Sequence, residues 1–216
     1  MELAFGESGL LPAVVQDRLT GQVRMVGYMS RESLAATLRT GRATFFSRSR
    51  SELWEKGQSS GNTLRVVSLH ADCDADTILV LVDPTGPTCH TGTPSCFFRS
   101  VGADGALTDE ARDATPFLEA LEREIEARKQ SVGSKSYTRH LLDGGPERIG
   151  AKLREEADEL ARAIESESDD RVASEAADVL YHAMVGLASR GVSLRDVLDK
   201  LAARAGTSGH DEKARR

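Results

Sequence analysis

The sequence LPAVVQDRLTGQVRMVGYM, residues 11–29, decides the fold of the first half of the chain. Leu11–Gln16 and Gln22–Met29 are rich in apolar, strand-forming residues, and the polar segment Asp17–Gly21 separates them. Two such runs joined by a short polar segment predict two strands and a turn. We therefore expect the first half of the chain to be built on a sheet.

The residues that follow predict one helix and more strands. Ser30 is a helix-capping residue type, and we expect a helix that runs to about Arg39 and ends before Gly41. Three further runs are rich in Val, Ile, Thr and Phe, which favour strands: Ala43–Ser47, Thr63–Leu69 and Thr77–Val82. One short helix among several strands predicts an α+β domain with a mixed or antiparallel, barrel-like sheet.

Apolar residues in the second half recur at helical spacing, which predicts an all-α domain. Helices are expected to start near Pro116, Pro146, Arg171 and Ser193. Glycine, alanine and aspartate replace the strand pattern between residues 102 and 114. We therefore place the first domain at residues 1–110 and the second at residues 111–205, and we expect residues 206–216 to form a disordered tail.

Composition and charge exclude several classes of function. A length of 216 residues accommodates one large domain or two small ones. The net charge of −6 lacks the basic excess with which a protein displaces counterions from nucleic acid. No apolar run approaches the roughly 20 residues that span a bilayer, and the first residues lack a signal-peptide pattern. We therefore expect a cytoplasmic protein that binds neither nucleic acid nor membrane.

Three cysteines lie among acidic residues near the middle of the chain, and their odd number does not fit a closed disulfide framework. Thiolates are zinc ligands and carboxylates are magnesium ligands. The candidate ligands are Cys73, Cys89 and Cys96 for zinc and Asp72, Asp74 and Asp76 for magnesium. Three protein ligands leave one zinc position for water, as in catalytic zinc sites. The alternatives are plain burial of the cysteines and an ordinary acidic turn. If residues 72–76 are extended, the aspartates lie on one face and Cys73 on the other.

Hydroxyl, guanidinium and glycine residues crowd together between residues 46 and 62. This combination suits phosphate binding through backbone amides and charge-assisted hydrogen bonds, although similar runs also occur in plain loops. The candidate substrate-binding residues are Ser47, Arg48, Trp54, Lys56, Ser60, Gly61 and Asn62.

Together these motifs resemble phosphoribosyl-AMP cyclohydrolase of histidine biosynthesis. The resemblance covers Leu10 to Arg99 and rests on Asp-Cys-Asp-x-Asp, on Cys-His-Thr-Gly-x-x-Ser-Cys-Phe, and on Phe-Phe-Ser-Arg-Ser-Arg…Leu-Trp-x-Lys-Gly-x-x-Ser-Gly-Asn. It implies a homodimer with the active site at the interface, where Cys73 of one subunit and the other two cysteines of its partner bind zinc, and the aspartates bind magnesium. Two positions depart from the family pattern: Gln58 replaces the usual Glu, and Ala75 lies where Gly is common.

The resemblance implies hydrolytic opening of the adenine ring of phosphoribosyl-AMP between N1 and C6. The substituent on N1 makes C6 electrophilic, and zinc lowers the pKa of water toward ~7, so that hydroxide is available for attack. His90 lies next to a proposed ligand and is a candidate catalytic proton shuttle. The alternative is that His90 only supports that ligand.

Five carboxylates in the second half are spaced so that they share sides of two expected helices. They are Glu155, Glu156 and Glu159 on the first helix and Glu175 and Asp178 on the second. Antiparallel packing would bring them together, where mutual repulsion calls for a cation such as magnesium. A solvated charged helix face is the alternative interpretation.

This pattern resembles the all-α nucleotide pyrophosphohydrolases, and its surroundings resemble phosphoribosyl-ATP pyrophosphohydrolase. The resemblance spans Pro116 to Arg204 and includes Lys-Ser-Tyr-Thr at residues 135–138. It implies that magnesium aligns the attacking water and neutralises the pyrophosphate leaving group. The candidate substrate-binding residues are Lys135, Ser136, Tyr137, Arg148 and Lys152. The basic residues among them are equally compatible with ordinary surface side chains.

Both resemblances predict a bifunctional hydrolase whose second domain catalyses the earlier of two consecutive steps. Two other interpretations stay open. One is a metal-stabilised binding or dimerisation module, which a fourth protein ligand on zinc, such as His70 or His90, would favour. The other is a nucleotide hydrolase of different specificity. The deaminase signature His-x-Glu…Pro-Cys-x-x-Cys is absent from the sequence, which argues against a deaminase.

Overall fold

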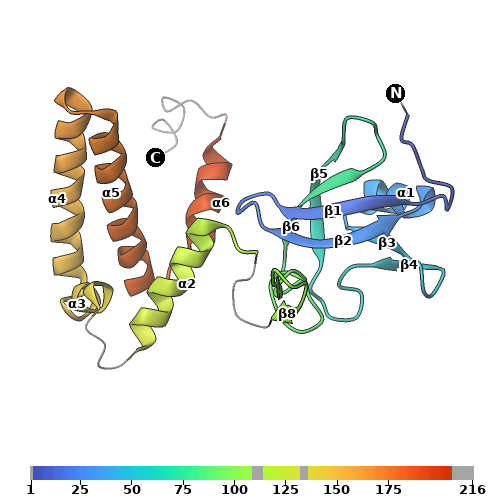
Figure 1. Cartoon of the computed structure of the whole chain (residues 1–216), viewed down its shortest axis with the longest axis horizontal. Coiled ribbons are helices and arrows are strands. Elements are labelled where there is room, and N and C mark those ends of the chain that lie inside the picture. The colour runs from blue at the N-terminus through green and yellow to red at the C-terminus, as the bar shows by residue number, and fades with distance from the viewer. Residues whose placement is uncertain (1, 109–113, 132–135, 206–216) are drawn as a thin grey trace. The chain divides into compact units, whose positions relative to one another are not determined.

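The computed structural model describes residues 2–108, 114–131 and 136–205 (Figure 1). The chain divides into two compact units, Met1–Pro116 and Phe117–Arg216, each with its own hydrophobic core. The domain boundary expected at residue 110 and the tail expected at residues 206–216 both lie outside the described residues. No helix in the described ranges combines the length and the apolar character needed to cross a membrane.

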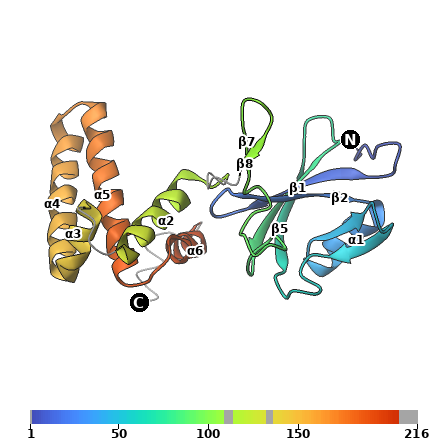
Figure 2. The ribbon, with the colours of Figure 1, turned by 60° about the horizontal axis from the view of Figure 1, so that its bottom comes forward.

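A four-stranded mixed sheet forms the centre of the first unit (Figure 2). The strands are ordered β2 (Val23–Met29), β1 (Leu11–Asp17), β6 (Ile78–Pro84) and β5 (Leu64–Ala71). Strand β1 is antiparallel to β2 and parallel to β6, and β5 is antiparallel to β6. The predicted α+β domain with a mixed sheet is confirmed, although these four strands do not close on themselves in the part of the chain described.

Helix α1 (Arg31–Thr40) has both of its predicted ends and lies on one side of the sheet (Figure 2). The Ser30 hydroxyl accepts a hydrogen bond from the Ser33 N–H at 3.2 Å, and the Ser33 hydroxyl accepts one from the Ser30 N–H at 2.8 Å. This reciprocal pair satisfies two N–H groups that a helix N-terminus leaves open. At the other end, Gly41 has φ 69°, a left-handed conformation that glycine adopts without steric cost.

Two short hairpins complete the first unit. The strand β3 (Thr44–Ser47), which the sequence predicts, pairs with β4 (Glu52–Glu55), which it does not. A further pair, β7 (Ser100–Val101) and β8 (Leu107–Thr108), lies where the strand pattern stops in the sequence. Strands of two to four residues are too short to show a clear alternation of apolar residues.

The core of the first unit follows the alternation along β1. Leu11, Ala13 and Val15 are completely buried, whereas the residues between them face outward. Phe45 of β3 is also completely buried and packs against Gly27 of β2. A Cβ atom at Gly27 would lie 2.6 Å from a carbon of the Phe45 ring. Position 27 therefore needs glycine because a ring occupies the space of any side chain.

The described residues of the second unit form five helices, which confirms the predicted all-α domain (Figure 1). They are α2 (Phe117–Gln130), α3 (Tyr137–Asp143), α4 (Gly145–Ser166), α5 (Asp169–Ser189) and α6 (Leu194–Arg204). The short link between α4 and α5 makes them an antiparallel pair. The Ser168 hydroxyl caps α5 by accepting from the Arg171 N–H, and Ser193 with Asp196 forms the predicted capping box of α6.

Two candidate active sites

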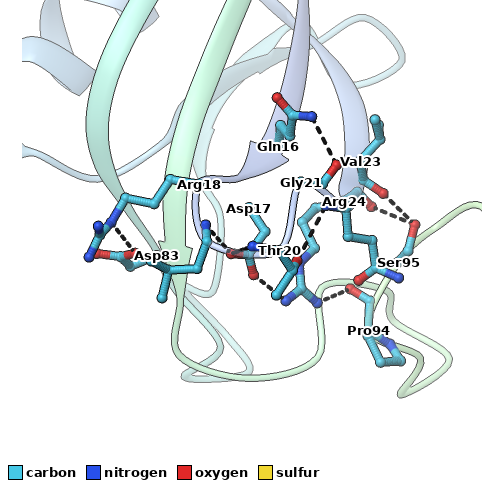
Figure 3. A network of polar contacts seen from close by, with 12 residues as sticks. Gln16, Asp17, Arg18, Thr20, Gly21, Val23, Arg24, Asp83, Pro94 and Ser95 are labelled. Atoms are coloured by element: carbon cyan, nitrogen blue, oxygen red, sulfur yellow. Dashed lines mark hydrogen bonds and ion pairs between the residues drawn. The ribbon is translucent and has the colours of Figure 1, made fainter. Parts of the chain in front are cut away.

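A loop between residues 88 and 97 carries two of the three cysteines and is anchored to the start of β2 (Figure 3). Arg24 lies between Asp17 and Pro94, with 2.6 Å between a guanidinium nitrogen and the Asp17 carboxylate and 3.0 Å to the Pro94 carbonyl oxygen. The Ser95 hydroxyl donates to the Val23 carbonyl at 2.7 Å, and the Cys96 N–H donates to the Arg24 carbonyl at 2.8 Å. The second half of the cysteine loop, residues 94–96, is thus held by polar contacts to β2, whose Arg24 is itself paired with Asp17 of β1.

Cys89 and Cys96 are brought together by the way this loop folds back on itself. The Cys89 N–H donates to the Thr93 carbonyl at 3.1 Å. Burial by itself raises the pKa of the Cys89 thiol, but hydrogen bonds from Thr91, Thr93 and Cys96 lower that pKa overall; the Thr91 hydroxyl lies 3.1 Å from the sulfur. Burial and the neighbouring Cys89 together raise the pKa of Cys96 to about 11, against the opposing effect of the Lys56 ammonium. Two adjacent thiols could supply half of the ligands of a tetrahedral zinc site.

Cys73 does not join the other two cysteines within one chain. It is exposed, and the three sulfur atoms do not all lie within 4.8 Å of one another. His90 is also exposed, with its Nδ1 3.8 Å from the Cys89 sulfur.

The three aspartates that surround Cys73 converge through a turn. We expected alternating faces if residues 72–76 were extended, but the segment is not extended. The Asp72 carboxylate accepts the N–H groups of Asp76 at 3.0 Å and Thr77 at 3.1 Å, which closes the turn. These two hydrogen bonds outweigh the effect of desolvation and lower the pKa of Asp72. Asp72, Asp74 and Asp76 each offer a carboxylate oxygen within 4.8 Å of the others, so the turn gathers three hard ligands.

The backbone conformation of this turn makes alanine unfavourable at position 75, where glycine is common in the family pattern. Ala75 has φ 62°, in the left-handed region that non-glycine residues rarely adopt. Its side chain is buried, and its carbonyl accepts the Ala4 N–H at 2.8 Å. Packing around the methyl group offsets part of the backbone strain.

The predicted phosphate-binding residues lie on β3 and β4, in the turn between them, and in the loop that follows β4. Arg48 stacks its guanidinium 3.9 Å from the centre of the Tyr28 ring. Trp54 packs against Phe45, with 5.2 Å between ring centres, so part of its role is in the core. The loop turns sharply at Gly57, where a Cβ would lie 2.5 Å from the backbone of Asn62. The remaining predicted residues of this group are Ser47, Lys56, Ser60 and Gly61.

A second acidic cluster lies between α4 and α5. Glu156 of α4 and Glu175 and Asp178 of α5 have carboxylate oxygens within 4.8 Å of one another. Glu156 is 7% exposed and Glu175 is 3% exposed, which is rare for ionised carboxylates because burial removes their hydration. The other two predicted members do not belong to this group: Glu155 is exposed, and Glu159 is partly buried.

Two basic residues balance the buried carboxylates. Lys152 lies one turn before Glu156 and contacts it at 2.8 Å, and it contacts Glu155 at 3.0 Å. Hydrogen bonds to Glu156 and Glu155 raise the pKa of Lys152, so the ammonium stays charged. Arg171 forms an ion pair with Glu175 one turn further along α5. Each buried carboxylate therefore has a cation four residues before it.

The other predicted residues of this site have different placements. Lys135 lies outside the described residues, and Ser136 precedes α3 with its hydroxyl buried. Tyr137 contacts His182, with 3.1 Å between its hydroxyl and Nε2. Arg148 contacts His140 at 2.8 Å. Sequence reasoning also missed Arg171, although its i,i+4 spacing to Glu175 could have indicated the ion pair. The Asp17–Arg24–Pro94 contacts carry no local signal, because they join separate chain segments.

Fold and site geometry define a two-domain hydrolase in which an α+β unit precedes an all-α unit. Residues 25–98 match the phosphoribosyl-AMP cyclohydrolase family, and residues 118–205 match the phosphoribosyl-ATP pyrophosphohydrolase family. A histidine biosynthesis bifunctional protein HisIE of Caldanaerobacter subterraneus subsp. tengcongensis is 42% identical over 200 residues, which cover 93% of this chain and 95% of that protein. The Wolinella succinogenes protein of the same name is 44% identical over 94% of this chain and 91% of its own length. A chloroplastic relative from Arabidopsis thaliana is 44% identical over 99% of this chain and 79% of its own length.

The chain belongs to this family of bifunctional histidine-biosynthesis enzymes, which combine a cyclohydrolase domain with a pyrophosphohydrolase domain. The predicted family, the fold of each half and the two enzyme activities are therefore confirmed. The individual ligand and substrate residues remain predictions.

Proposed function

We propose that the second unit hydrolyses phosphoribosyl-ATP to phosphoribosyl-AMP and pyrophosphate, and that the first unit then opens the adenine ring between N1 and C6. The family match of each unit supports this assignment. The main structural support is that the first unit gathers three carboxylates in a turn and pairs two thiols in a loop, and that the second unit gathers three carboxylates on α4 and α5. We further propose that both steps take place in the cytoplasm, where three free cysteines stay reduced.

For the first unit, we propose that a second copy of the chain supplies Cys73 to the pair Cys89 and Cys96. The separation of Cys73 from the pair within one chain supports a shared site. The outward face of the sheet supports it as well: Val14 lies opposite both Val26 and Leu79 across the strands. These three form an apolar row, and Val26 is 46% exposed. An apolar row of this kind fits a self-complementary interface between two copies.

The donor set of three thiolates fits zinc, which when bound would supply a hydroxide near neutral pH. The chain's own residues would then bind and orient the substrate. Arg48 and Lys56 provide positive charge for its phosphate groups, and the backbone turn at Gly61 lets the chain approach them closely. His90 is exposed beside Cys89 and can move a proton between the substrate and solvent. The turn with Asp72, Asp74 and Asp76 would hold magnesium.

For the second unit, we propose that Glu156, Glu175 and Asp178 hold magnesium, with Glu155 and Glu159 completing the acidic face. Magnesium when bound would neutralise charge on the pyrophosphate leaving group. Lys152 is already charged at the edge of the cluster. When a cation neutralises the charge of the Glu156 carboxylate, the Lys152 ammonium becomes free to contact phosphate oxygens. Arg148, four residues earlier on α4, extends the positive charge along the helix.

Each assignment is tested by one substitution in the full-length protein supplied with phosphoribosyl-ATP, zinc and magnesium. Cys96→Ser removes one proposed zinc ligand, so ring opening should be lost while pyrophosphate release continues. Glu156→Gln removes a charge from the helical cluster, so pyrophosphate release should be lost while added phosphoribosyl-AMP is still opened. Loss of both steps in either variant would contradict independent sites, and full activity would remove that residue from its site.

A further inference from the structure

A buried histidine connects α3 to the acidic cluster of the second unit. His182 lies on α5, and its side chain is 4% exposed. Its Nδ1 lies 2.8 Å from the backbone carbonyl oxygen of Asp178, and its Nε2 lies 3.1 Å from the Tyr137 hydroxyl. The same Nδ1 lies 4.0 Å from the Glu156 carboxylate. One imidazole ring thus lies near the carboxylate of one proposed magnesium ligand, Glu156, and contacts one proposed substrate-binding residue, Tyr137.

The partners of the ring determine which way its hydrogen bonds run. A backbone carbonyl only accepts, so the contact to Asp178 places the proton on Nδ1 of His182. In the neutral imidazole, Nε2 is then an acceptor, and the Tyr137 hydroxyl must donate to it. Both rings are held in this arrangement by an edge-on contact, with 5.9 Å between their centres.

The direction of the hydrogen bond from Tyr137 to His182 limits how the Tyr137 hydroxyl can interact with a ligand. Its proton is committed to His182, so only the oxygen lone pairs remain free. The oxygen can accept a hydrogen bond from an O–H group, but it does not donate to a phosphate oxygen. Tyr137 is half exposed, and its hydroxyl lies 3.1 Å from the imidazole whose other nitrogen is 4.0 Å from the Glu156 carboxylate, which places it beside the acidic cluster.

We propose that His182 is a positioning residue of the pyrophosphohydrolase site, which holds the Tyr137 hydroxyl as a hydrogen-bond acceptor for an O–H group beside Glu156. The O–H group belongs either to a sugar hydroxyl of the substrate or to the attacking water. This inference rests on the proposed location of the site at Glu156, Glu175 and Asp178. It gives a role to a buried residue that the assignment of ligands leaves without one.

The neighbouring residues provide a matched control. Thr138 follows Tyr137, and Tyr181 precedes His182; their hydroxyl groups are 2.7 Å apart. This second hydrogen bond also ties α3 to α5, but neither residue belongs to the acidic cluster. Tyr181→Phe therefore removes a bond between the same two helices without changing the Tyr137 hydroxyl.

The test measures kcat and KM for pyrophosphate release from phosphoribosyl-ATP, together with thermal unfolding, in full-length variants. Tyr137→Phe and His182→Asn should each lower kcat/KM by ~10-fold, the effect of one lost hydrogen bond to a reacting or binding group. His182→Gln should retain most activity, because its carboxamide oxygen can reach the position of Nε2. The double variant Tyr137→Phe/His182→Asn should be no worse than either single variant, since both remove one interaction. Tyr181→Phe should keep kcat/KM while lowering the unfolding temperature.

The kinetic parameters also identify the O–H group. A rise in KM assigns it to the substrate, and a fall in kcat assigns it to the attacking water. Wild-type kcat/KM in Tyr137→Phe would overturn the proposal, as would equal losses in Tyr181→Phe and His182→Asn, because docking of α3 would then explain the effect. Glu156→Gln distinguishes failure of the proposed pyrophosphohydrolase site from failure of the proposed role of His182. Full activity in that variant refutes the site itself, whereas its inactivity beside a fully active Tyr137→Phe refutes only the role of His182.

Discussion

Replacement of Arg24 by methionine tests whether a buried ion pair holds the cysteine loop. The Arg24 and Asp17 side chains are 8% and 0% exposed, and 2.6 Å separates their charged atoms. Arg24→Met preserves most of the volume and removes the charge, so the buried Asp17 carboxylate loses the guanidinium that lies 2.6 Å away. Removing one member of a buried pair costs about 3–5 kcal/mol. We expect Arg24→Met to lower the free energy of unfolding of the first unit by this amount.

The assay uses the single tryptophan of the chain. Trp54 packs against Phe45 in the core of the first unit, so its fluorescence reports the unfolding of that unit in urea. A loss of about 4 kcal/mol at an m-value of about 2 kcal/mol/M shifts the midpoint by roughly 2 M. Arg42→Met is the matched control, because the Arg42–Glu55 pair is largely exposed and should contribute at most about 1 kcal/mol.

A second variant separates the effect of the buried Asp17 charge from the effect of the lost contact with Arg24. In Asp17→Asn/Arg24→Met, a neutral amide replaces the buried carboxylate and still accepts the N–H groups of Leu19 and Thr20. This double variant should be more stable than Arg24→Met alone, because the buried carboxylate charge is removed together with its guanidinium. An Arg24→Met variant as stable as Arg42→Met would refute the reasoning, since the buried pair would then contribute no more to the free energy of unfolding than the exposed pair.

Two further predictions concern single positions. Gly27→Ala should destabilise the first unit by about 1–3 kcal/mol, because its Cβ would lie 2.6 Å from the Phe45 ring; a urea midpoint equal to that of the wild type would show that the ring moves aside freely. Thr91→Val should raise the pKa of Cys89 in metal-free protein, since the hydroxyl 3.1 Å from the sulfur favours the thiolate. The ultraviolet absorbance of the thiolate should then appear at higher pH than in the wild type, and an unchanged titration would assign the low pKa to the other donors.

Local sequence signals predicted the regular elements well. Alternation along β1 and the capping residues Ser30 and Ser193 act within a few residues of where they occur, so their signals are complete in the sequence. Helix α3 was not predicted, because seven residues are too few to show helical periodicity. The hairpin β7–β8 was missed for the same reason.

The candidate sites were predictable in residue type and only partly in geometry. Spacing placed five carboxylates on two helices, but the rotation of α4 against α5 decides that Glu156 is buried there and that Glu155 and Glu159 are not. The segment with Cys73 forms a turn because the Asp72 side chain accepts two backbone N–H groups. The alternation of residue types along the sequence does not show whether such hydrogen bonds form. The roles of Arg24 and His182 depend on contacts between distant segments, which no local pattern encodes.

The proposal that the zinc ligands come from two copies of the chain is tested most directly by mixing two inactive variants. Cys73→Ser and Cys96→Ser should each lack ring-opening activity toward phosphoribosyl-AMP. In a mixed dimer, one site carries both substitutions and the other carries neither. An equal mixture, unfolded and refolded together, should therefore recover about a quarter of the wild-type activity, because half of the dimers are mixed and each has one intact site. A mixture that stays as inactive as its components, although mixed dimers form, would contradict a zinc site shared between two copies.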